Sequence, residues 1–216
     1  QFDRIGSAAD PVHRVRVYRR RADREVAGFC AAALAFGQVR SVLASIDAVL
    51  SATGSSPAAY VRRFEPERDG TALRSLAHRW TRGVDLIALV WILRRMLEEA
   101  GSIEAFFPQV YRADAEDIAD ALDSFCRRAL AFDVEHVYRS GRHRGVTYFF
   151  PRPADGSACK RLNLYLRWMV RRDQIDLGVW RRVDPAKLIV PLDTHVIRVG
   201  QCLRLTRYRS PGRPMA

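Results

Sequence analysis

Residues 84–99 constrain the fold most, because their side chains are apolar almost all the way around a helix. A helix without a polar face has to be buried on every side. We therefore predict a central helix that ends at Gly101, with the other elements packed around it. The longest apolar run, residues 86–93, has eight residues, whereas a helix that spans a membrane needs about 20.

Helical periodicity continues through most of the chain. It is clearest in four further segments, which are residues 23–37, 38–50, 115–132 and 159–172. Asp23, Ser102 and Asp114 are candidate N-caps. The best β-like piece, residues 146–150, is short. The sequence predicts an all-α protein.

The positive charge is confined to one part of the chain. The net charge is +12 at pH 7, and residues 139–216 carry all of it, whereas residues 1–138 are neutral. A localised basic region is typical of a surface for a polyanion, most often nucleic acid. A basic segment without function is the alternative. We expect a mainly helical, charge-neutral lobe over residues 1–138 and a basic loop with two helices over residues 139–216, joined as one structural unit around one cleft.

Lysine is rare in this chain. Of 36 basic residues only Lys160 and Lys187 are lysines. Arginine contacts phosphate at least as well as lysine, but its guanidinium cannot form a Schiff base. A lysine in such a chain is therefore a candidate for amine chemistry, with chance as the alternative.

The predicted helix over residues 159–172 follows a long basic loop, residues 139–157. One face of this helix carries polar side chains at steps of three and four, namely Lys160, Asn163, Arg167 and Arg171. Ser157 is the expected N-cap and places Lys160 in the first turn, where free backbone N–H groups can hold a phosphate. A solvated basic face is the plain alternative.

Asp193 stands where a further helix is expected to begin, after the apolar residues 188–192. The helical spacing predicts that Val196, Val199 and Leu203 point inward. A capping carboxylate can also face a cleft, so the two roles of Asp193 are compatible.

The residues Asp193-Thr194-His195-Val196, after an apolar run and Pro191, resemble the catalytic aspartate segment of the helix-hairpin-helix base-excision DNA glycosylases. In that superfamily an aspartate opens a helix and faces the flipped nucleotide, and an upstream lysine is the nucleophile of the bifunctional members. The Leu-Pro-Gly-x-Gly hairpin and four-Cys iron–sulfur cluster of endonuclease III are absent here. The spacing of 33 residues from Lys160 to Asp193 is nearest to that of the archaeal 8-oxoguanine (GO) glycosylase.

A second resemblance covers most of the chain. It is to a largely bacterial family of unknown function, and the matching segments are residues 25–37, 101–107, 156–163, 166–171, 176–180 and 191–195. In that family further helices follow the aspartate helix, whereas this chain stops soon after it. We therefore expect a two-lobed, helix-hairpin-helix glycosylase-like fold whose C-terminal part is truncated.

The glycosylase resemblance implies a role for each candidate residue. Lys160 attacks the sugar of a flipped-out nucleotide, and Asp193 stabilises the developing charge. The implied nucleic-acid contacts are Gly156, Ser157, Arg161, Asn163, Arg167 and Arg171. Trp168, Trp180 and His195 are candidates for the base pocket, with a core position as the alternative for a tryptophan. This chemistry needs no cofactor and no metal.

We expect double-stranded DNA with a damaged base, such as an oxidised purine, as the partner, with RNA as an alternative and no membrane. This partner implies a cytoplasmic location at the bacterial nucleoid. The four Cys form no CxxC pair, which fits buried thiols in a reducing compartment. Two other classes stay open: a non-catalytic nucleic-acid-binding module of the same fold, and an interaction protein for an acidic partner. A metal-dependent nuclease is disfavoured, because Glu135, His136 and His143 lack a convincing ligand spacing.

Overall fold

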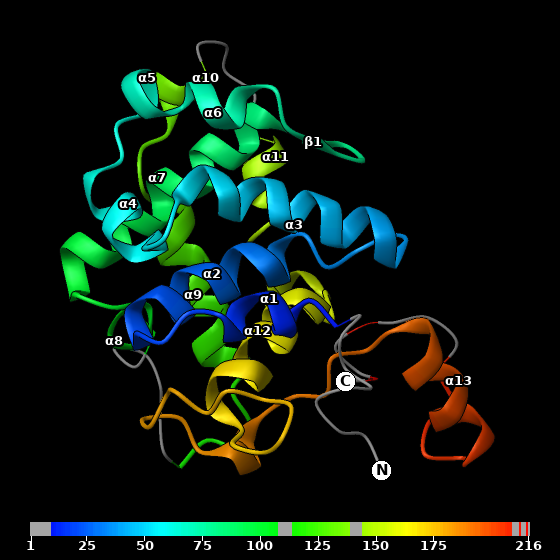
Figure 1. Ribbon diagram of the computed structural model, residues 1–216. Helices are drawn as coiled ribbons and strands as arrows, with labels where there is room; N and C mark the ends of the chain where they lie inside the picture. The colour runs from blue at the N-terminus through cyan, green and yellow to red at the C-terminus, as the bar shows by residue number, and fades with distance from the viewer. Residues whose placement is uncertain (1–9, 108–113, 139–143, 209–211, 213–214, 216) are drawn as a thin grey trace.

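The computed structural model describes residues 10–107, 114–138, 144–208, 212 and 215. These residues are mostly helical, with one small hairpin (Figure 1). The elements are α1 (Val12–Arg16), α2 (Arg21–Ala33), α3 (Val39–Thr53), α4 (Pro57–Arg63), α5 (Pro66–Asp69), α6 (Thr71–Arg74), β1 (Ala77–His78), β2 (Thr81–Arg82), α7 (Gly83–Ala100), α8 (Ile103–Phe106), α9 (Ala119–Leu130), α10 (Glu135–Tyr138), α11 (Arg144–Thr147), η2 (Pro153–Asp155), α12 (Lys160–Val170), η3 (Pro185–Lys187) and α13 (Thr194–Cys202). The prediction of a mostly helical protein is confirmed.

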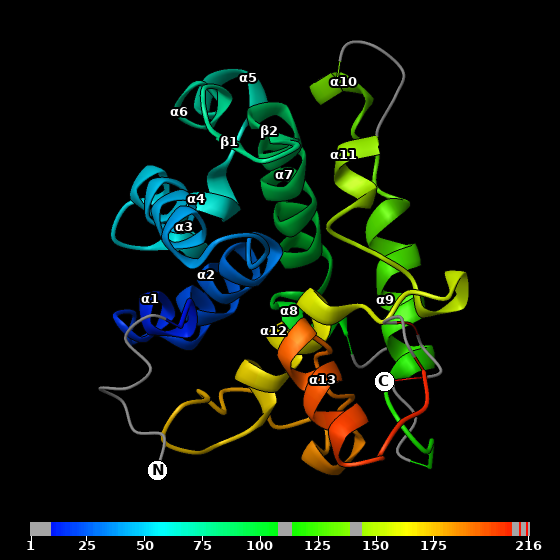
Figure 2. The same cartoon turned by 90° about the vertical axis from the view of Figure 1, so that its right-hand side faces the viewer.

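Helix α7 is the buried central helix that its sequence predicts. It contacts α4, α6, α8, α9, α10 and α11, and Figure 2 shows it between the α3–α4 side and α9. The helix ends where expected, because Gly101 adopts a left-handed conformation with φ of 80°. The largest apolar element therefore organises the rest of the fold around it.

Helix α12 packs along α2 and so joins the basic part of the chain to the neutral part. The two helices approach closely at Gly28. A Cβ atom at that position would lie 2.8 Å from Cε of Met169 and 3.4 Å from the ring of Tyr165. The glycine lets α12 sit near the α2 backbone, which fixes the position of the helix that begins with Lys160.

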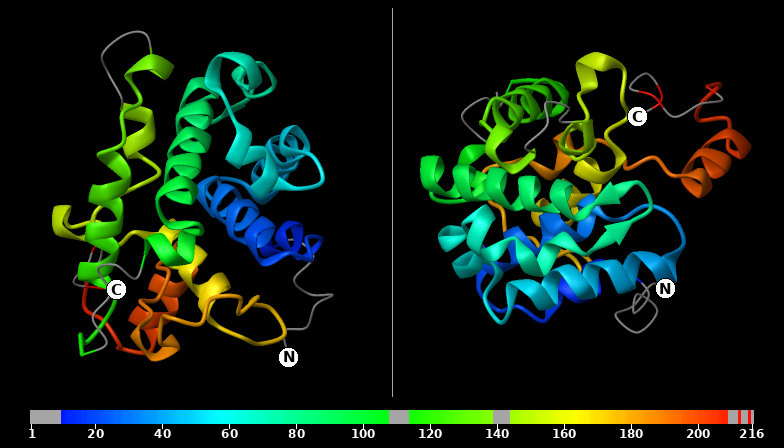
Figure 3. Two further views of the ribbon diagram at one scale, coloured as in Figure 1. Left: turned by 90° about the vertical axis from the view of Figure 1, so that its left-hand side faces the viewer. Right: turned by 90° about the horizontal axis from the view of Figure 1, so that it is seen from above.

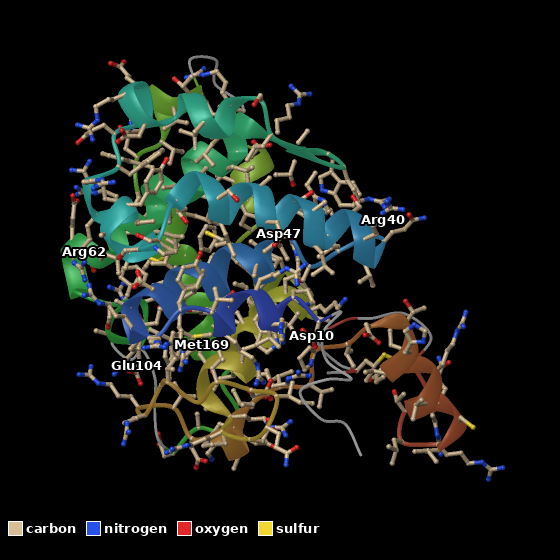
Figure 4. The ribbon with its side chains drawn as sticks, viewed as in Figure 1. Asp10, Arg40, Asp47, Arg62, Glu104 and Met169 are labelled. Atoms are coloured by element: carbon tan, nitrogen blue, oxygen red, sulfur yellow. The ribbon has the colours of Figure 1, made fainter. Side chains whose placement is uncertain are left out.

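A buried carboxylate joins the same two parts at another point. Glu104, labelled in Figure 4, is 1% exposed and accepts the backbone N–H groups of Arg181 and Arg182 at 2.5 and 2.8 Å. It also pairs with Arg21, which reaches the buried carboxylate of Glu25 at 3.0 Å. Burial raises the pKa of Glu25, and the hydrogen bond from Arg21 opposes that shift.

Several predicted boundaries are wrong in instructive ways. Residues 146–150 form no strand, because Val146 belongs to α11 and buries its side chain together with Phe149 and Phe150. The only strands of the described residues are β1 and β2, which pair antiparallel across a two-residue turn. The segment over residues 115–132 is helical only within α9. The prediction that Ser102 is an N-cap is confirmed, because its hydroxyl accepts the N–H of Ala105 in α8 at 3.0 Å.

The prediction that the apolar residues of α13 point inward is also wrong. Val196, Val199 and Leu203 are 39%, 57% and 63% exposed. The helix lies to one side of the other helices in Figure 1 and in the view from above in Figure 3. None of its residues is buried, so most of its apolar face is exposed to solvent.

Candidate functional site

Lys160 and Asp193 line one cavity of about 430 Å³. Lys160 comes from the first turn of α12, and Asp193 immediately precedes α13. Residues just before α1 and at the start of α3 line its other sides, and Arg167 and His195 also line it. The two residues are not ion-paired with each other. The candidate amine and carboxylate therefore line the same cavity without forming an ion pair.

The local structure before Lys160 differs from the prediction. Helix α12 begins at Lys160, and its N-cap is Cys159, which has a left-handed φ of 47°. Ser157 is not the N-cap; its hydroxyl instead accepts the N–H of Cys159 at 3.1 Å. A left-handed conformation is uncommon for a residue with a side chain and stores backbone strain. This sharp entry places Lys160 at the very start of the helix.

Asp193 is the N-cap of α13, as predicted. Its Oδ1 accepts the backbone N–H groups of His195 and Val196 at 2.9 and 2.8 Å. Both hydrogen bonds end on the same oxygen, and neither involves Oδ2. One carboxylate oxygen thus holds the helix, while the other makes no hydrogen bond within the described residues.

The basic face of α12 is mostly neutralised by acidic partners. Arg167 contacts Asp176 at 3.2 Å, and Arg171 contacts Asp173 at 2.8 Å and Asp176 at 3.6 Å. Burial raises the pKa of Asp176, and the nearby Arg167 opposes that shift. Lys160 differs from these arginines, because its ammonium group makes no hydrogen bond or ion pair within the described residues.

Arg161 is an anchor inside the protein rather than an open phosphate contact. Its guanidinium donates to the carbonyl of Ala33 at 2.8 Å and to that of Tyr148, and it lies 3.7 Å from the Tyr148 ring centre. Burial lowers the pKa of Arg161 to about 10. Because Ala33 ends α2, this arginine ties α12 to the C-terminus of that helix.

Three other predicted site residues lie in the core. Asn163 is 2% exposed and donates to the carbonyl of Ala158 at 2.9 Å, so it cannot reach a phosphate. Trp168 is fully buried and Trp180 is 3% exposed, with the Trp180 ring 5.5 Å from that of Tyr165. The assignment of these tryptophans to a base pocket is therefore wrong. His195 is exposed and lines the cavity.

A second cavity of about 540 Å³ also includes Lys160. Ser157 and Arg161 contribute to its wall, together with Phe36 and Tyr148. Gly156, which directly precedes Ser157, is exposed and ends η2 with a φ of 81°. Phe36 lines both cavities, so Lys160 and Phe36 stand where the two spaces meet.

Sequence reasoning missed two features of the site. Asp10 lines the cavity of Lys160 and Asp193, and its carboxylate accepts the N–H of Val12 at 3.0 Å; Figure 4 shows it at the start of α1. An Asp-Pro pair before a helical pattern is the signal that could have identified it. The second feature is the pair of aromatic rings next to Phe36, those of Trp80 and Tyr148. These residues are far apart in the sequence and meet only in the folded chain.

The described residues hold no group of three or more His, Cys, Asp or Glu side chains suited to a metal ion. His136 packs against Trp91 with ring centres 4.8 Å apart, and His143 lies outside the described residues. Cys30, Cys126 and Cys159 are buried thiols, as predicted, but Cys202 is exposed. No helix within the described ranges is long and apolar enough to cross a membrane.

Comparison with known proteins places the chain in a family but gives it no activity. Neither the curated proteins nor the solved structures include a significant match. The family model described as a protein of unknown function, DUF2400, matches residues 10–215. Because this match covers nearly the whole sequence, the chain belongs to the DUF2400 family of proteins of unknown function.

Proposed function

We propose that this protein is a DNA base-excision glycosylase with abasic-site lyase activity, in which Lys160 is the nucleophile and Asp193 stabilises charge. One observation carries the proposal. Lys160 and Asp193 belong to separate helices yet line one cavity, and the Lys160 ammonium is not held by any acidic partner in the described part of the chain. An opposite charge nearby favours the protonated form of an amine, whereas the neutral form is the nucleophile.

The proposed reaction begins with a nucleotide that is flipped out of the duplex, because C1′ cannot be reached inside the stack. The neutral Lys160 amine forms a bond to C1′ as the bond to the base breaks, and the departing base takes a proton. The nitrogen then loses a proton, and the sugar ring opens to a Schiff base as its oxygen is protonated. Removal of a proton from C2′ breaks the C3′–O bond and nicks the strand.

The other groups of the cavity support this chemistry. We assign to the Asp193 carboxylate, which lines the cavity, the stabilisation of an oxocarbenium-like sugar and the relay of protons. His195 lines the same space and can donate a hydrogen bond to a bound phosphate. A two-lobed arrangement like that of the helix-hairpin-helix glycosylases, a damaged duplex as substrate, oxidised purines as lesions and action at the nucleoid all belong to this proposal.

Borohydride trapping tests the proposal directly. The protein is mixed with duplexes that carry either 8-oxoguanine or an abasic site, borohydride is added, and covalent adducts are separated by gel electrophoresis. The chain offers a matched control, because Lys187 is its only other lysine. We expect an adduct with the wild type and with Lys187→Gln, and none with Lys160→Gln.

Two results would count against the proposal. An adduct that still forms with Lys160→Gln would show that another amine is the nucleophile. A folded wild-type protein that binds the duplex but gives no adduct would instead be a non-catalytic nucleic-acid-binding module. Circular dichroism of each variant shows that a negative result does not come from unfolding.

A further inference from the structure

All four tryptophans lie within the described residues, and only Trp80 is exposed, at 55%. It occupies the turn between β1 and β2, in the sequence His78-Arg79-Trp80-Thr81. Exposing a large aromatic surface to water is unfavourable. The protein nevertheless holds this ring at the tip of a hairpin, on the same side of α7 as α3 (Figure 1).

The hairpin is a fixed support for this ring. Arg79 has a left-handed φ of 54°, in a two-residue turn where glycine would be the relaxed choice. The imidazole of His78 is 2% exposed and is held at both nitrogens, with Ser45 Oγ and the carbonyl of Phe36 each 2.9 Å away. The strained turn and the pinned histidine fix the direction in which Trp80 points.

Two other aromatic rings complete the surface. The rings of Trp80 and Phe36 are stacked with centres 4.9 Å apart and planes at 30°. Tyr148 stands edge-on to both, with ring centres 5.2 Å from each. We call Phe36, Trp80 and Tyr148 the aromatic platform. Its members come from three distant parts of the sequence, so no local pattern reveals it.

Arginines lie beside the aromatic platform. The guanidinium of Arg79 lies 5.2 Å from the Trp80 ring centre, and the buried guanidinium of Arg161 lies against Tyr148, 3.7 Å from its ring centre. Figure 4 shows Arg40 at the exposed tip of α3 on the side of the hairpin. Stacked aromatic rings among arginines fit a partner that has both flat rings and negative charge.

We infer that the aromatic platform stacks on an unpaired base and that the protein binds single-stranded DNA there. Every base has a face that can stack on an aromatic ring, and the phosphates next to it suit Arg79 and Arg40. The inference goes beyond the proposed function, because stacking needs neither Lys160 nor Asp193. Phe36 and Tyr148 also line cavities that contain Lys160, so a strand bound here passes beside the proposed nucleophile.

Fluorescence anisotropy with a labelled oligothymidylate tests the inference. The full chain is titrated as wild type, Trp80→Ala, Trp80→Phe and Tyr208→Ala, the last being a control because Tyr208 is exposed to a similar extent, 54%, away from the aromatic platform. We expect Trp80→Ala to weaken binding by about 5- to 150-fold, the range of one lost base–aromatic stack. Trp80→Phe and Tyr208→Ala should stay within a few-fold of the wild type.

Intrinsic fluorescence gives a second readout. Stacking of a base on Trp80 should quench tryptophan emission in the wild type, whereas Trp80→Phe should bind without that quenching. Wild-type affinity in Trp80→Ala, or unchanged quenching in Trp80→Phe, would overturn the inference. A failed borohydride trap together with Trp80-dependent binding would refute the proposed function and support the inference, because stacking needs neither Lys160 nor Asp193.

Discussion

The carboxylate of Asp23 caps the first turn of α4 by accepting the backbone N–H of Ala58 at 3.0 Å. Asp23 lies in the first turn of α2, where the sequence predicts it to cap its own helix. It does not do so, and Ser56 donates its hydroxyl to the same carboxylate oxygen at 2.8 Å. The acid therefore joins α2 and α4 through two residues that are 35 positions apart in the chain.

We expect Asp23→Ala to lower the free energy of unfolding by about 1–3 kcal/mol, because a helix cap is lost and two donors lose their acceptor. Urea unfolding followed by circular dichroism measures this change. Asp47→Ala is the control, since the pair of Asp47 with Arg14 is largely exposed and contributes little. Equal stability of Asp23→Ala and the wild type would show that the cap is unimportant.

Those features of the fold that depend on neighbours in sequence are predictable. The all-round apolar pattern of α7 and the glycine at its end need no tertiary information. The use of Asp23 by another helix, and the exposure of the apolar face of α13, depend on which elements meet in space. Periodicity shows that a helix has an apolar face but not whether a partner covers that face.

The residues of the candidate site can also be predicted only in part from the sequence. Lys160 and Asp193 can be nominated from residue type, spacing and resemblance, and they do line one cavity. Trp168 and Trp180 could not be assigned, because a tryptophan in a core and one in a pocket have the same local sequence. Trp80 carried a weak signal, an aromatic residue between Arg79 and Arg82, which acquires meaning only beside Phe36 and Tyr148.

Asp123 should make stability depend on acid pH. It accepts hydrogen bonds from Arg152 at 2.9 and 3.1 Å and from the N–H of Ala154, in the segment that leads to Lys160. The hydrogen bond from Arg152, followed by that from Ala154, lowers the pKa of Asp123 below its ordinary value of 3.8. For a carboxyl with a lowered pKa, the stabilisation is present above the ordinary value and is lost as pH falls through the folded-state value.

We therefore expect Asp123→Asn to be less stable than the wild type at pH 5, and the difference to shrink as the pH falls below about 4. Urea midpoints at pH 5 and pH 3 measure it. Asn has no carboxyl to protonate, so only the stability of the wild type should depend on pH through this residue. A difference that stays constant over that range would assign the effect to packing rather than to the charge.

Gly28 should tolerate alanine but not a branched side chain. The Cβ of alanine would press on Cε of Met169, the flexible end of a side chain, while alanine favours the helix. Valine adds two methyl groups against Met169 and Tyr165 and should cost about 1–3 kcal/mol of unfolding free energy. Thermal unfolding of both variants checks this, and a stable Gly28→Val would mean that α12 can shift away from α2.

Asp193→Asn separates the two roles of Asp193. Asparagine caps helices about as well as aspartate, so the hydrogen bonds to His195 and Val196 and the fold of α13 should survive. The negative charge beside Lys160 is lost, and we expect base release to slow by about 10²- to 10⁴-fold, the usual range for a group that transfers protons. Single-turnover release of 8-oxoguanine measures the effect, with binding of the same duplex as the control for folding.

Asp193→Ala should in addition lose about 1 kcal/mol of helix stability, because it removes the cap as well as the charge. Base release by Asp193→Asn at the wild-type rate would leave Asp193 as a helix cap and nothing more, since the oxygen that does not cap the helix would then have no part in the reaction.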